Sequence, residues 1–250
     1  MAEAGDVRAS LFVTCLVDQF FPQVGESVVA VLRRLGVTVN FPWGQTCCGQ
    51  PAFNSGFRGE ARAVARRVLE LFEGNQYVVV PSGSCASMVR VFYPELFQDE
   101  PALARAAREL AGRVYEFSEF LVKVVGVTDV GAASSGRVTY HPSCHLVREL
   151  GVVQEPLQLI AKVRGIEFVP LRGDVPCCGF GGSFAVKMAS ISEAMLEEKL
   201  REIEGSAPDV VVSCDMSCLM HIGGALARRR PRVRVMHLAQ LLAGQGEPWR

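Results

Sequence analysis

Two copies of a Cys-Cys-Gly motif, about 130 residues apart, restrict the folds open to this chain. Each copy has one cysteine before the motif and one after it: Cys15, Cys47, Cys48 and Cys85 in the first copy, and Cys144, Cys177, Cys178 and Cys218 in the second. The second set follows the first by 129, 130, 130 and 133 residues. Four cysteines in register predict a duplication, in which both halves share one fold.

The segments between the cysteines predict the same order of elements in both copies. A strand leads to the first cysteine, a helical pattern follows, and a second strand, expected at 37–41 and 166–171, leads to the cysteine pair. Next come another helix and a strand with an unbroken run of valines, "YVVV" or "DVVVS". Strands that are apolar on both faces are typical of parallel sheets covered by helices on both sides.

We therefore predict an α/β fold of two duplicated, pseudo-symmetric half-domains, each a mostly parallel sheet flanked by helices. The loops at the carboxyl ends of the strands would carry the chemistry, and the eight cysteines are expected there. The Gly- and Ser-rich segment 126–137 is expected to separate half-domains 1–130 and 131–250. The helices after the cysteine pairs are expected to bury Ala61, Val64, Ala65, Val68, Leu69 and Phe72 in the first copy, and Met188, Ile191 and Met195 in the second.

Charge and apolar patterning argue against several classes of protein. The 26 basic residues balance 26 acidic ones, which disfavours nucleic-acid binding. No apolar run approaches the roughly 20 residues of a membrane span, and the start "MAEAGDVRAS" does not look like a secretory signal. We expect a cytoplasmic protein. Its nine cysteines are then poor candidates for disulfides, which leaves metal binding, redox chemistry or apolar packing.

Thiolates are soft ligands that suit zinc, cuprous copper or iron-sulfur clusters, so residue type alone does not select the metal. Zinc sites are usually built on Cys-x2-4-Cys pairs. Here only Cys214 and Cys218 have such a spacing, and that pair has no counterpart in the first copy. Adjacent cysteines are awkward ligands for one small ion but can bind different irons of a cluster. The glycines after each pair would let backbone N–H groups approach sulfur closely.

This pattern resembles the cysteine-rich CCG domain found in heterodisulfide reductase, in the iron-sulfur subunit of glycolate oxidase, and in anaerobic glycerol-3-phosphate dehydrogenase. The stretches "NFPWGQTCCGQPAFNSG", "PSGSC", "YHPSC" and "CCGFGGSFAVKM" are most similar to the lactate utilization protein A family. The resemblance extends from about Leu11 to Leu242.

The resemblance implies an oxidoreductase subunit that transfers electrons in a multi-protein system oxidising L-lactate to pyruvate, with lactate utilization proteins B and C as partners. It also implies one or two iron-sulfur clusters of the 4Fe-4S type, cubane or non-cubane. Their ligands would be Cys15, Cys47, Cys48 and Cys85 in the first motif, and Cys144, Cys177, Cys178 and Cys218 in the second. No catalytic residue is assigned.

The chain departs from the fullest form of the motif, which ends in Cys-x-x-Cys. Ser82 and Asp215 stand where the first of those two cysteines would be, so that each copy keeps four thiolates. Four suffice for a cubane, and either residue could supply an oxygen ligand. Cys214 could substitute, although a small buried residue at a strand end is the simpler interpretation.

The histidines and two competing functions remain open. His141 and His145 flank Cys144 closely enough to donate a hydrogen bond or move a proton, or to be ordinary turn residues. His221 and His237 are expected to have core or surface roles away from the pairs. One competing function is a cluster that reacts with a thiol or disulfide; the other is a non-catalytic zinc scaffold or redox sensor.

Overall fold

The computed structural model describes residues 7–173, 177–230 and 232–244. The chain divides into two compact units, Met1–Val127 and Thr128–Arg250. Each unit contains one four-stranded sheet in which every strand pair is parallel, with the order β2-β1-β3-β4 in the first unit and β6-β5-β7-β8 in the second. The predicted α/β class, with duplicated parallel sheets flanked by helices, is confirmed.

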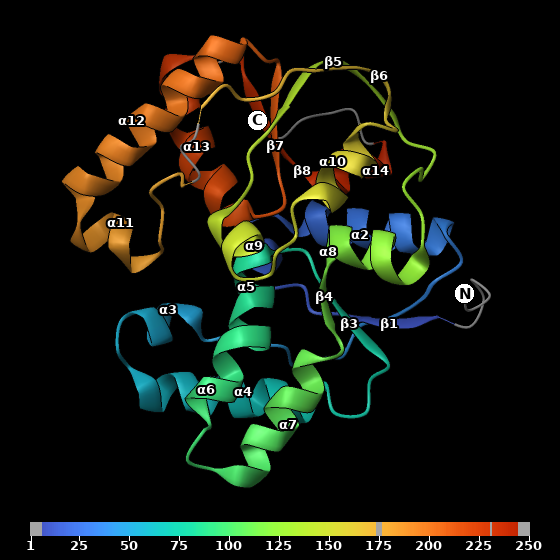
Figure 1. Cartoon of the computed structure of the whole chain (residues 1–250), viewed down its shortest axis with the longest axis vertical. Helices are drawn as coiled ribbons and strands as arrows, with labels where there is room; N and C mark the ends of the chain where they lie inside the picture. The colour runs from blue at the N-terminus through green and yellow to red at the C-terminus, as the bar shows by residue number, and fades with distance from the viewer. Residues whose placement is uncertain (1–6, 174–176, 231, 245–250) are drawn as a thin grey trace. The chain divides into compact units, whose positions relative to one another are not determined.

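The first unit alternates short strands with helices. Its elements are β1 (Arg8–Leu11), α1 (Cys15–Phe20), α2 (Pro22–Arg34), β2 (Thr38–Asn40), α3 (Gln50–Asn54), α4 (Arg58–Leu71), β3 (Tyr77–Val80), α5 (Gly83–Ser87), the π-helical turn η2 (Met88–Phe92), α6 (Tyr93–Leu96), α7 (Pro101–Ala111), β4 (Val114–Glu116), α8 (Phe117–Glu119) and the π-helical turn η3 (Phe120–Val125). Figure 1 shows α2 and α8 on one face of this sheet and α4, α6 and α7 on the other.

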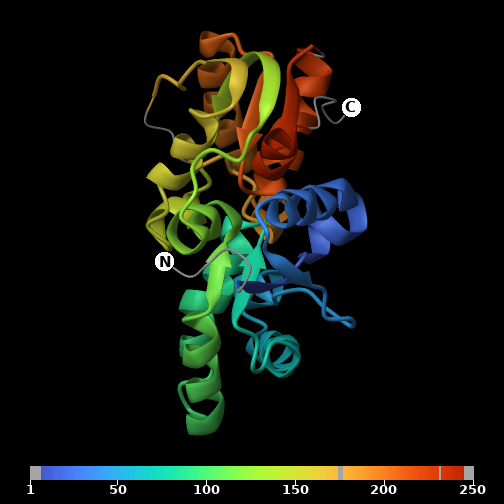
Figure 2. The ribbon, with the colours of Figure 1, turned by 90° about the vertical axis from the view of Figure 1, so that its right-hand side faces the viewer.

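The second unit repeats this order with fewer helices. Its elements are β5 (Ala133–Tyr140), α9 (Cys144–Arg148), α10 (Gln154–Ile160), β6 (Arg164–Phe168), α11 (Ser183–Lys187), α12 (Ala189–Ser206), β7 (Val210–Ser213), α13 (Met216–Arg229), β8 (Arg234–His237) and α14 (Leu238–Ala243). Figures 1 and 2 show α12 and α13 on one side of the sheet and α10 and α14 on the other.

Apolar side chains from both helix layers enclose each sheet. All three valines of Val78–Val80 are fully buried in β3, as are Val211 and Val212 in β7, which explains the unbroken valine runs. On α2 the buried stripe recurs at helical spacing and includes Val24, Val28 and Val31. The cores therefore form on both faces of each sheet. The loops at the strand ends can carry functional side chains. No helix among the described residues is long and apolar enough to span a membrane.

The predicted apolar face of the helix after the second cysteine pair is wrong. Met188 and Ile191 are exposed and Met195 is half-buried, whereas the buried stripe of α12 runs through Ser192, Leu196, Lys199, Leu200, Ile203 and Ser206. Three of these buried residues, Ser192, Lys199 and Ser206, are polar, which apolar periodicity does not anticipate. Ser192 donates a hydrogen bond to the carbonyl of Gly179, and Lys199 forms an ion pair with Glu202.

One predicted strand boundary also shifts. The strand expected at 166–171 is β6, Arg164–Phe168, and it stops before Pro170, whose missing N–H cannot extend a ladder. The segment 126–137, which was expected to separate the halves, contains the start of β5 at Ala133. Parallel pairing of β5 with both β6 and β7 stabilises this Gly- and Ser-containing stretch as a strand.

The glycine after each cysteine pair has the same left-handed backbone, with φ +85° at Gly49 and +86° at Gly179. The two glycines differ in how closely the next helix approaches. A Cβ on Gly179 would lie 2.6 Å from the Ser192 carbonyl oxygen, whereas a Cβ on Gly49 would lie 3.4 Å from its nearest neighbour, the Ala61 carbonyl oxygen. Both positions therefore need glycine for backbone conformation, but only Gly179 also needs it for space.

We accordingly expect Gly179→Ala to cost more stability than Gly49→Ala. Each change costs about 1–2 kcal/mol for the left-handed backbone, and the Gly179 variant costs about 1–3 kcal/mol more for the overlap with α12. Hydrogen exchange of α4 and α12 in the two full-length variants measures the opening free energy of each region. Equal losses would contradict this account.

Glu116 is a fully buried carboxylic acid that caps the start of α8. Its Oε2 accepts a hydrogen bond from the backbone N–H of Ser118 at 2.8 Å, while Oε1 has no partner among the described residues. Burial raises the pKa of Glu116 to about 7, against the opposing effect of the hydrogen bonds from Ser118. Below its ordinary value of 4.5 the group is protonated in both folded and unfolded chains, and above pH 7 the folded chain must bury the charge.

Stability of the first unit should therefore fall by at most about 3 kcal/mol as pH rises from 4.5 to 7. We expect Glu116→Gln to abolish this part of the pH dependence, because its amide does not ionise. Urea unfolding of the full chain at about pH 5 and about pH 7.5 provides the measurement. Glu73→Gln, on an exposed side chain, is the matched control. The same pH slope in wild type and Glu116→Gln would exclude Glu116 as the source.

Candidate metal centres

The repeated cysteines lie at the point where the strand order reverses in each sheet. The chain passes from β1 outward to β2 and then returns past β1 to β3, and it follows the same path from β5 to β6 and β7. Ligands of open α/β sheets bind at this switch point, outside the carboxyl ends of the strands. Cys15 and Cys144 begin the helices that follow the central strands β1 and β5, whereas Cys85 and Cys218 are the third residues of α5 and α13.

In the first unit the four cysteines form two close pairs. Cys15 Sγ and Cys47 Sγ lie 3.6 Å apart, and Cys48 Sγ and Cys85 Sγ lie 3.4 Å apart. The first pair is partly exposed and the second is buried. Adjacent cysteines on one loop thus face two different partners, which explains why the motif needs both.

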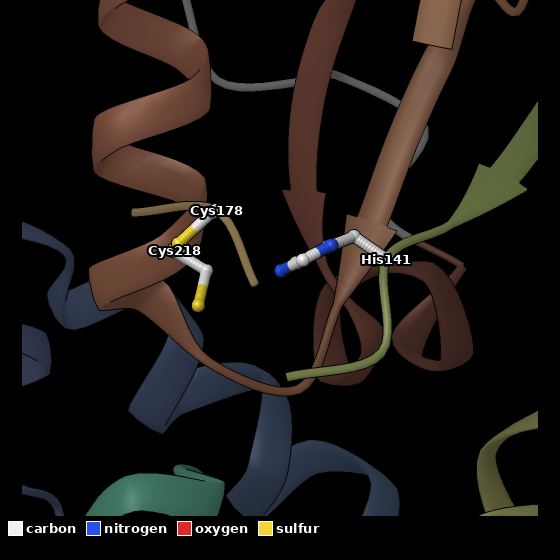
Figure 3. Close-up of side chains that lie close together, drawn as sticks. All are labelled: His141, Cys178 and Cys218. Carbon is white, nitrogen blue, oxygen red and sulfur yellow. The ribbon is translucent and has the colours of Figure 1, made fainter. Parts of the chain in front are cut away.

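The second unit repeats this division into an outer and an inner pair. Cys144 and Cys177 are partly exposed and share a hydrogen bond, while Cys178 and Cys218 are buried. The donor atoms of Cys178, Cys218 and His141 all lie within 4.8 Å of one another. Figure 3 shows the two cysteine side chains and the imidazole of His141 meeting in one space from different elements.

The surroundings of the first cysteine in each adjacent pair favour its thiolate form. Backbone N–H groups of Gly49 and Gly179 donate to the Sγ of Cys47 and Cys177, at 3.4 Å in both units. Hydrogen bonds from Cys15 and Cys48 lower the pKa of Cys47 to about 3, and those from Cys144 and Cys178 lower the pKa of Cys177 to about 2. A thiolate is the form that binds metals.

The neighbouring cysteines keep their protons in the absence of a metal. Hydrogen bonding to Cys47 and burial raise the pKa of Cys15, and hydrogen bonding to Cys177 and burial do the same for the pKa of Cys144. The pKa of Cys48 is raised by its bonds to Cys47 and Cys85 and by burial. Four thiolates in so small a space repel one another, and a bound cation would replace the shared protons.

Two residues that the sequence did not single out position the first centre. Gln45 donates to the carbonyl of Leu11 at 2.7 Å and accepts from the N–H of Val13 at 3.0 Å, which ties the loop after β2 to the loop after β1. Tyr93 donates to the carbonyl of Cys48 at 2.8 Å. Nothing in the local pattern marks either residue, because each partner lies more than 30 residues away in the sequence.

The second centre uses different anchors. Ser192 donates to the carbonyl of Gly179 at 2.8 Å and lies 3.4 Å from His221 Nε2. His221 is close enough to Cys177 that the thiolate raises its pKa, against a larger lowering by burial. The expectation that His221 lies away from the cysteine pair is therefore wrong. Its position on α13, one turn after Cys218, could have indicated this proximity.

Ser82 and Asp215, the residues at the missing cysteine positions, cap helices. Ser82 Oγ accepts from the N–H of Cys85 at 3.2 Å, and Asp215 Oδ1 accepts from the N–H and the hydroxyl of Ser217 at 3.1 and 2.6 Å. These bonds fix the first turns of α5 and α13, on which Cys85 and Cys218 lie. Cys214 is fully buried, and Tyr140 donates to its sulfur at 3.6 Å, which matches a packed strand-end residue.

The other histidines differ in burial and contacts. His237 is buried and caps α14, accepting from the N–H of Ala239 at 3.0 Å, so its expected core role is confirmed. His145 Nδ1 lies 3.7 Å from Cys144 Sγ at the partly exposed pair. His141 is fully buried, and burial lowers its pKa to about 3, so the imidazole is neutral.

A depression of about 390 Å3 opens beside the outer pair of the first unit. Its lining includes Cys15, Cys47, Phe41 and Trp43. The indole of Trp43 is 85% exposed and meets Phe41 edge to face, with ring centroids 5.4 Å apart. The "NFPW" stretch therefore does lie beside the cysteine pair, and it leaves the outer sulfur atoms accessible.

The donor sets fit a bound metal centre. Each unit offers four cysteine sulfur atoms, one of them already a thiolate held by a backbone N–H, as in metal–thiolate sites generally. The sulfur pairs of the first unit, at 3.4 and 3.6 Å, are slightly closer than two thiolates on one tetrahedral ion, which lie about 3.8 Å apart for a Zn–S bond of about 2.3 Å. Rotation about a single side-chain bond separates cysteine sulfurs further, as a cluster requires.

Comparisons with known proteins identify the repeat. A family model described as a cysteine-rich domain, CCG, matches residues 9–90 and 138–223. Lactate utilization protein A of Bacillus subtilis (strain 168) is 50% identical over 236 residues, covering 94% of this chain and 99% of that protein. Lactate utilization protein A 2 of Bacillus cereus (strain 03BB102) is 47% identical over 237 residues, covering 95% and 98%.

Solved structures add nothing to this assignment. Glutamate racemase from Thermus thermophilus is 12% identical, covers 97% of this chain and 79% of its own, and superimposes with a TM-score of 0.29, which is too low to support an argument. The family match rests instead on sequence, and its two segments contain all eight repeated cysteines. Together with the cysteine geometry it indicates metal or iron-sulfur binding. The chain belongs to the lactate utilization protein A family and carries two cysteine-rich domains.

Proposed function

We propose that this chain is the iron-sulfur electron-transfer subunit of a multi-protein system that oxidises L-lactate to pyruvate. The observation that carries the proposal is the convergence of four cysteines at the switch point of each parallel sheet, with one thiolate in each set already stabilised by a glycine N–H. The names of the relatives, lactate utilization proteins, supply the substrate.

The ligands in this proposal are the eight repeated cysteines: Cys15, Cys47, Cys48 and Cys85 in the first unit, and Cys144, Cys177, Cys178 and Cys218 in the second. An iron-sulfur cluster of the 4Fe-4S type would supply a one-electron relay in each unit that holds one. The buried inner cysteines would exclude water from one side of the centre, and the partly exposed outer cysteines would leave the other side open to an electron-exchange partner.

Lactate itself would react on a partner subunit. The sequence contains no complete dinucleotide or phosphate fingerprint, and "GFGG" after the second pair lacks the full Gly-x-Gly-x-x-Gly spacing. The word utilization and the letter A in the relatives' names are in keeping with a system of several components, for which we propose lactate utilization proteins B and C. This chain would then be active as an oxidoreductase only together with them.

A second candidate function is reduction of a thiol or disulfide at the first centre. The depression beside Cys15 and Cys47 favours it, because these sulfur atoms are accessible and its wall carries the exposed ring of Trp43. Disulfides would then perturb the spectrum of the bound centre. Lactate would leave that spectrum unchanged, both for this chain alone and for the chain mixed with the partner proteins. Spectral change on adding lactate with the partners would favour the electron-transfer role.

Metal analysis of protein purified without oxygen tests the cofactor. We expect about four irons and four acid-labile sulfides for each occupied unit, and a visible spectrum bleached by reduction. Zinc without sulfide would overturn the electron-transfer proposal in favour of a zinc scaffold or redox sensor, while leaving the fold intact.

Single serine substitutions test the ligand assignment one unit at a time. Cys48→Ser should remove the iron of the first unit, and Cys178→Ser should remove that of the second. If both units of the wild type hold a cluster, each variant should keep about half of the iron. Cys214→Ser, another buried cysteine outside both pairs, is the matched control and should keep all of it. Full iron and an unchanged spectrum in both Cys48→Ser and Cys178→Ser would exclude these cysteines as ligands.

A further inference from the structure

His141 occupies an unusual position in the second unit. It directly follows β5, the central strand, and its side chain is 0% exposed. Neither Nδ1 nor Nε2 has a hydrogen-bond partner in the described part of the chain. Buried imidazoles normally have at least one partner, because an unpaired polar group in the interior loses its hydration without compensation. This side chain is therefore arranged for a partner that the described part of the polypeptide does not provide.

The direction of the ring identifies that partner. A ring nitrogen of His141 and the sulfur atoms of Cys178 and Cys218 lie within 4.8 Å of one another, and the three side chains come from the segments that follow β5, β6 and β7. In Figure 3 the imidazole is directed toward the space beside the two sulfur atoms. One imidazole nitrogen and two thiolates are a mixed ligand set that suits zinc and iron.

The duplication provides an internal comparison. The residue three positions before Cys144 is His141, and the residue three positions before Cys15 is Phe12. Phe12 is also buried, but its ring packs against Phe72 with centroids 5.3 Å apart. The first unit thus has an apolar ring where the second has an imidazole, although both keep the inner cysteine pair.

We propose that His141 is a nitrogen ligand of the metal centre in the second unit, together with Cys178 and Cys218. The inference rests on the proposed function in that a metal centre is bound there, but it does not depend on lactate. The two centres would then differ, with thiolate ligands alone in the first unit and a neutral imidazole among the ligands in the second. Ligand type and hydrogen bonding set the reduction potential of an iron-sulfur centre, so the two centres would differ in potential.

Selective nitrogen labelling tests this ligand directly. The chain has four histidines, so protein grown with 15N-histidine, purified without oxygen and reduced gives few possible sources of nitrogen coupling in pulsed electron paramagnetic resonance. We expect a strong 15N hyperfine coupling in wild type that disappears in His141→Phe, which introduces the residue found in the first unit. His145→Gln and His221→Gln, at the other two histidines near the second centre, should retain it.

Several results would overturn the proposal. Iron and sulfide present with only weak 15N coupling would mean that His141 donates a hydrogen bond to sulfur or holds a water molecule. Loss of the strong coupling in His145→Gln instead of His141→Phe would assign the ligand to His145. Circular dichroism checks that each variant folds. His141→Cys is the second variant: it should retain the centre with a thiolate, lose the coupling and lower the reduction potential.

Failure of the proposed function would look different. If the purified protein contains no iron or sulfide, Co2+ titration of the metal-free chain still tests His141, because the cobalt absorption bands report nitrogen and sulfur ligands. We expect His141→Phe to weaken Co2+ binding to the second unit by about tenfold or more, and Phe12→Leu, at the matched position, to leave Co2+ binding to the first unit unchanged. Equal Co2+ affinity and equal spectra in wild type and His141→Phe would overturn the ligand role.

Discussion

Both centres depend on one hydrogen bond, in which the N–H of a glycine with a left-handed backbone donates to the sulfur of the cysteine two residues earlier. Gly49 and Gly179 donate their N–H groups to Cys47 and Cys177 at 3.4 Å, and their φ of +85° and +86° give both loops the same turn after the cysteine pair. That turn separates the adjacent sulfurs, one toward the partly exposed cysteine after the central strand and the other toward the buried cysteine on the next helix. A residue with a Cβ would strain the turn, so the motif is Cys-Cys-Gly and not simply two cysteines.

The parallel sheet explains why these residues meet although they are far apart in the sequence. With the order β2-β1-β3-β4, the loops after β1, β2 and β3 open on one edge, and the strand order reverses between β1 and β3, where such sheets bind their ligands. The duplication reproduces this edge in β6-β5-β7-β8. The anchors behind it are not reproduced: Tyr93 holds the first loop and Ser192 the second. The geometry of the loop therefore persists while its supports differ.

Sequence patterns predicted the parallel sheets and the grouping of the cysteines, since valine runs and register depend on local periodicity. They failed where a buried position is polar. The stripe of α12 includes Ser192 and Lys199, whose burial depends on Gly179 and Glu202, and apolar periodicity therefore pointed to Met188 and Ile191. Gln45 and Tyr93 were also missed, because the backbone atoms to which they bond are brought near by the fold. Whether the cysteines bind a metal depends on the ligand chemistry of their sulfur atoms, which neither sequence periodicity nor packing reveals.

A duplicated chain need not keep two equivalent centres. The inner cysteine pairs are alike, but Phe12 closes one site with an apolar ring and His141 presents two nitrogens at the other, both unpaired within the described residues. An exact repeat would place equal ligand charge in both units and give an electron no preference between them. An imidazole in place of the phenyl ring would change the ligands and the hydrogen bonding around one centre only, and both influence reduction potential. Under the proposed ligand role, the difference between Phe12 and His141 would give the second centre a reduction potential different from that of the first.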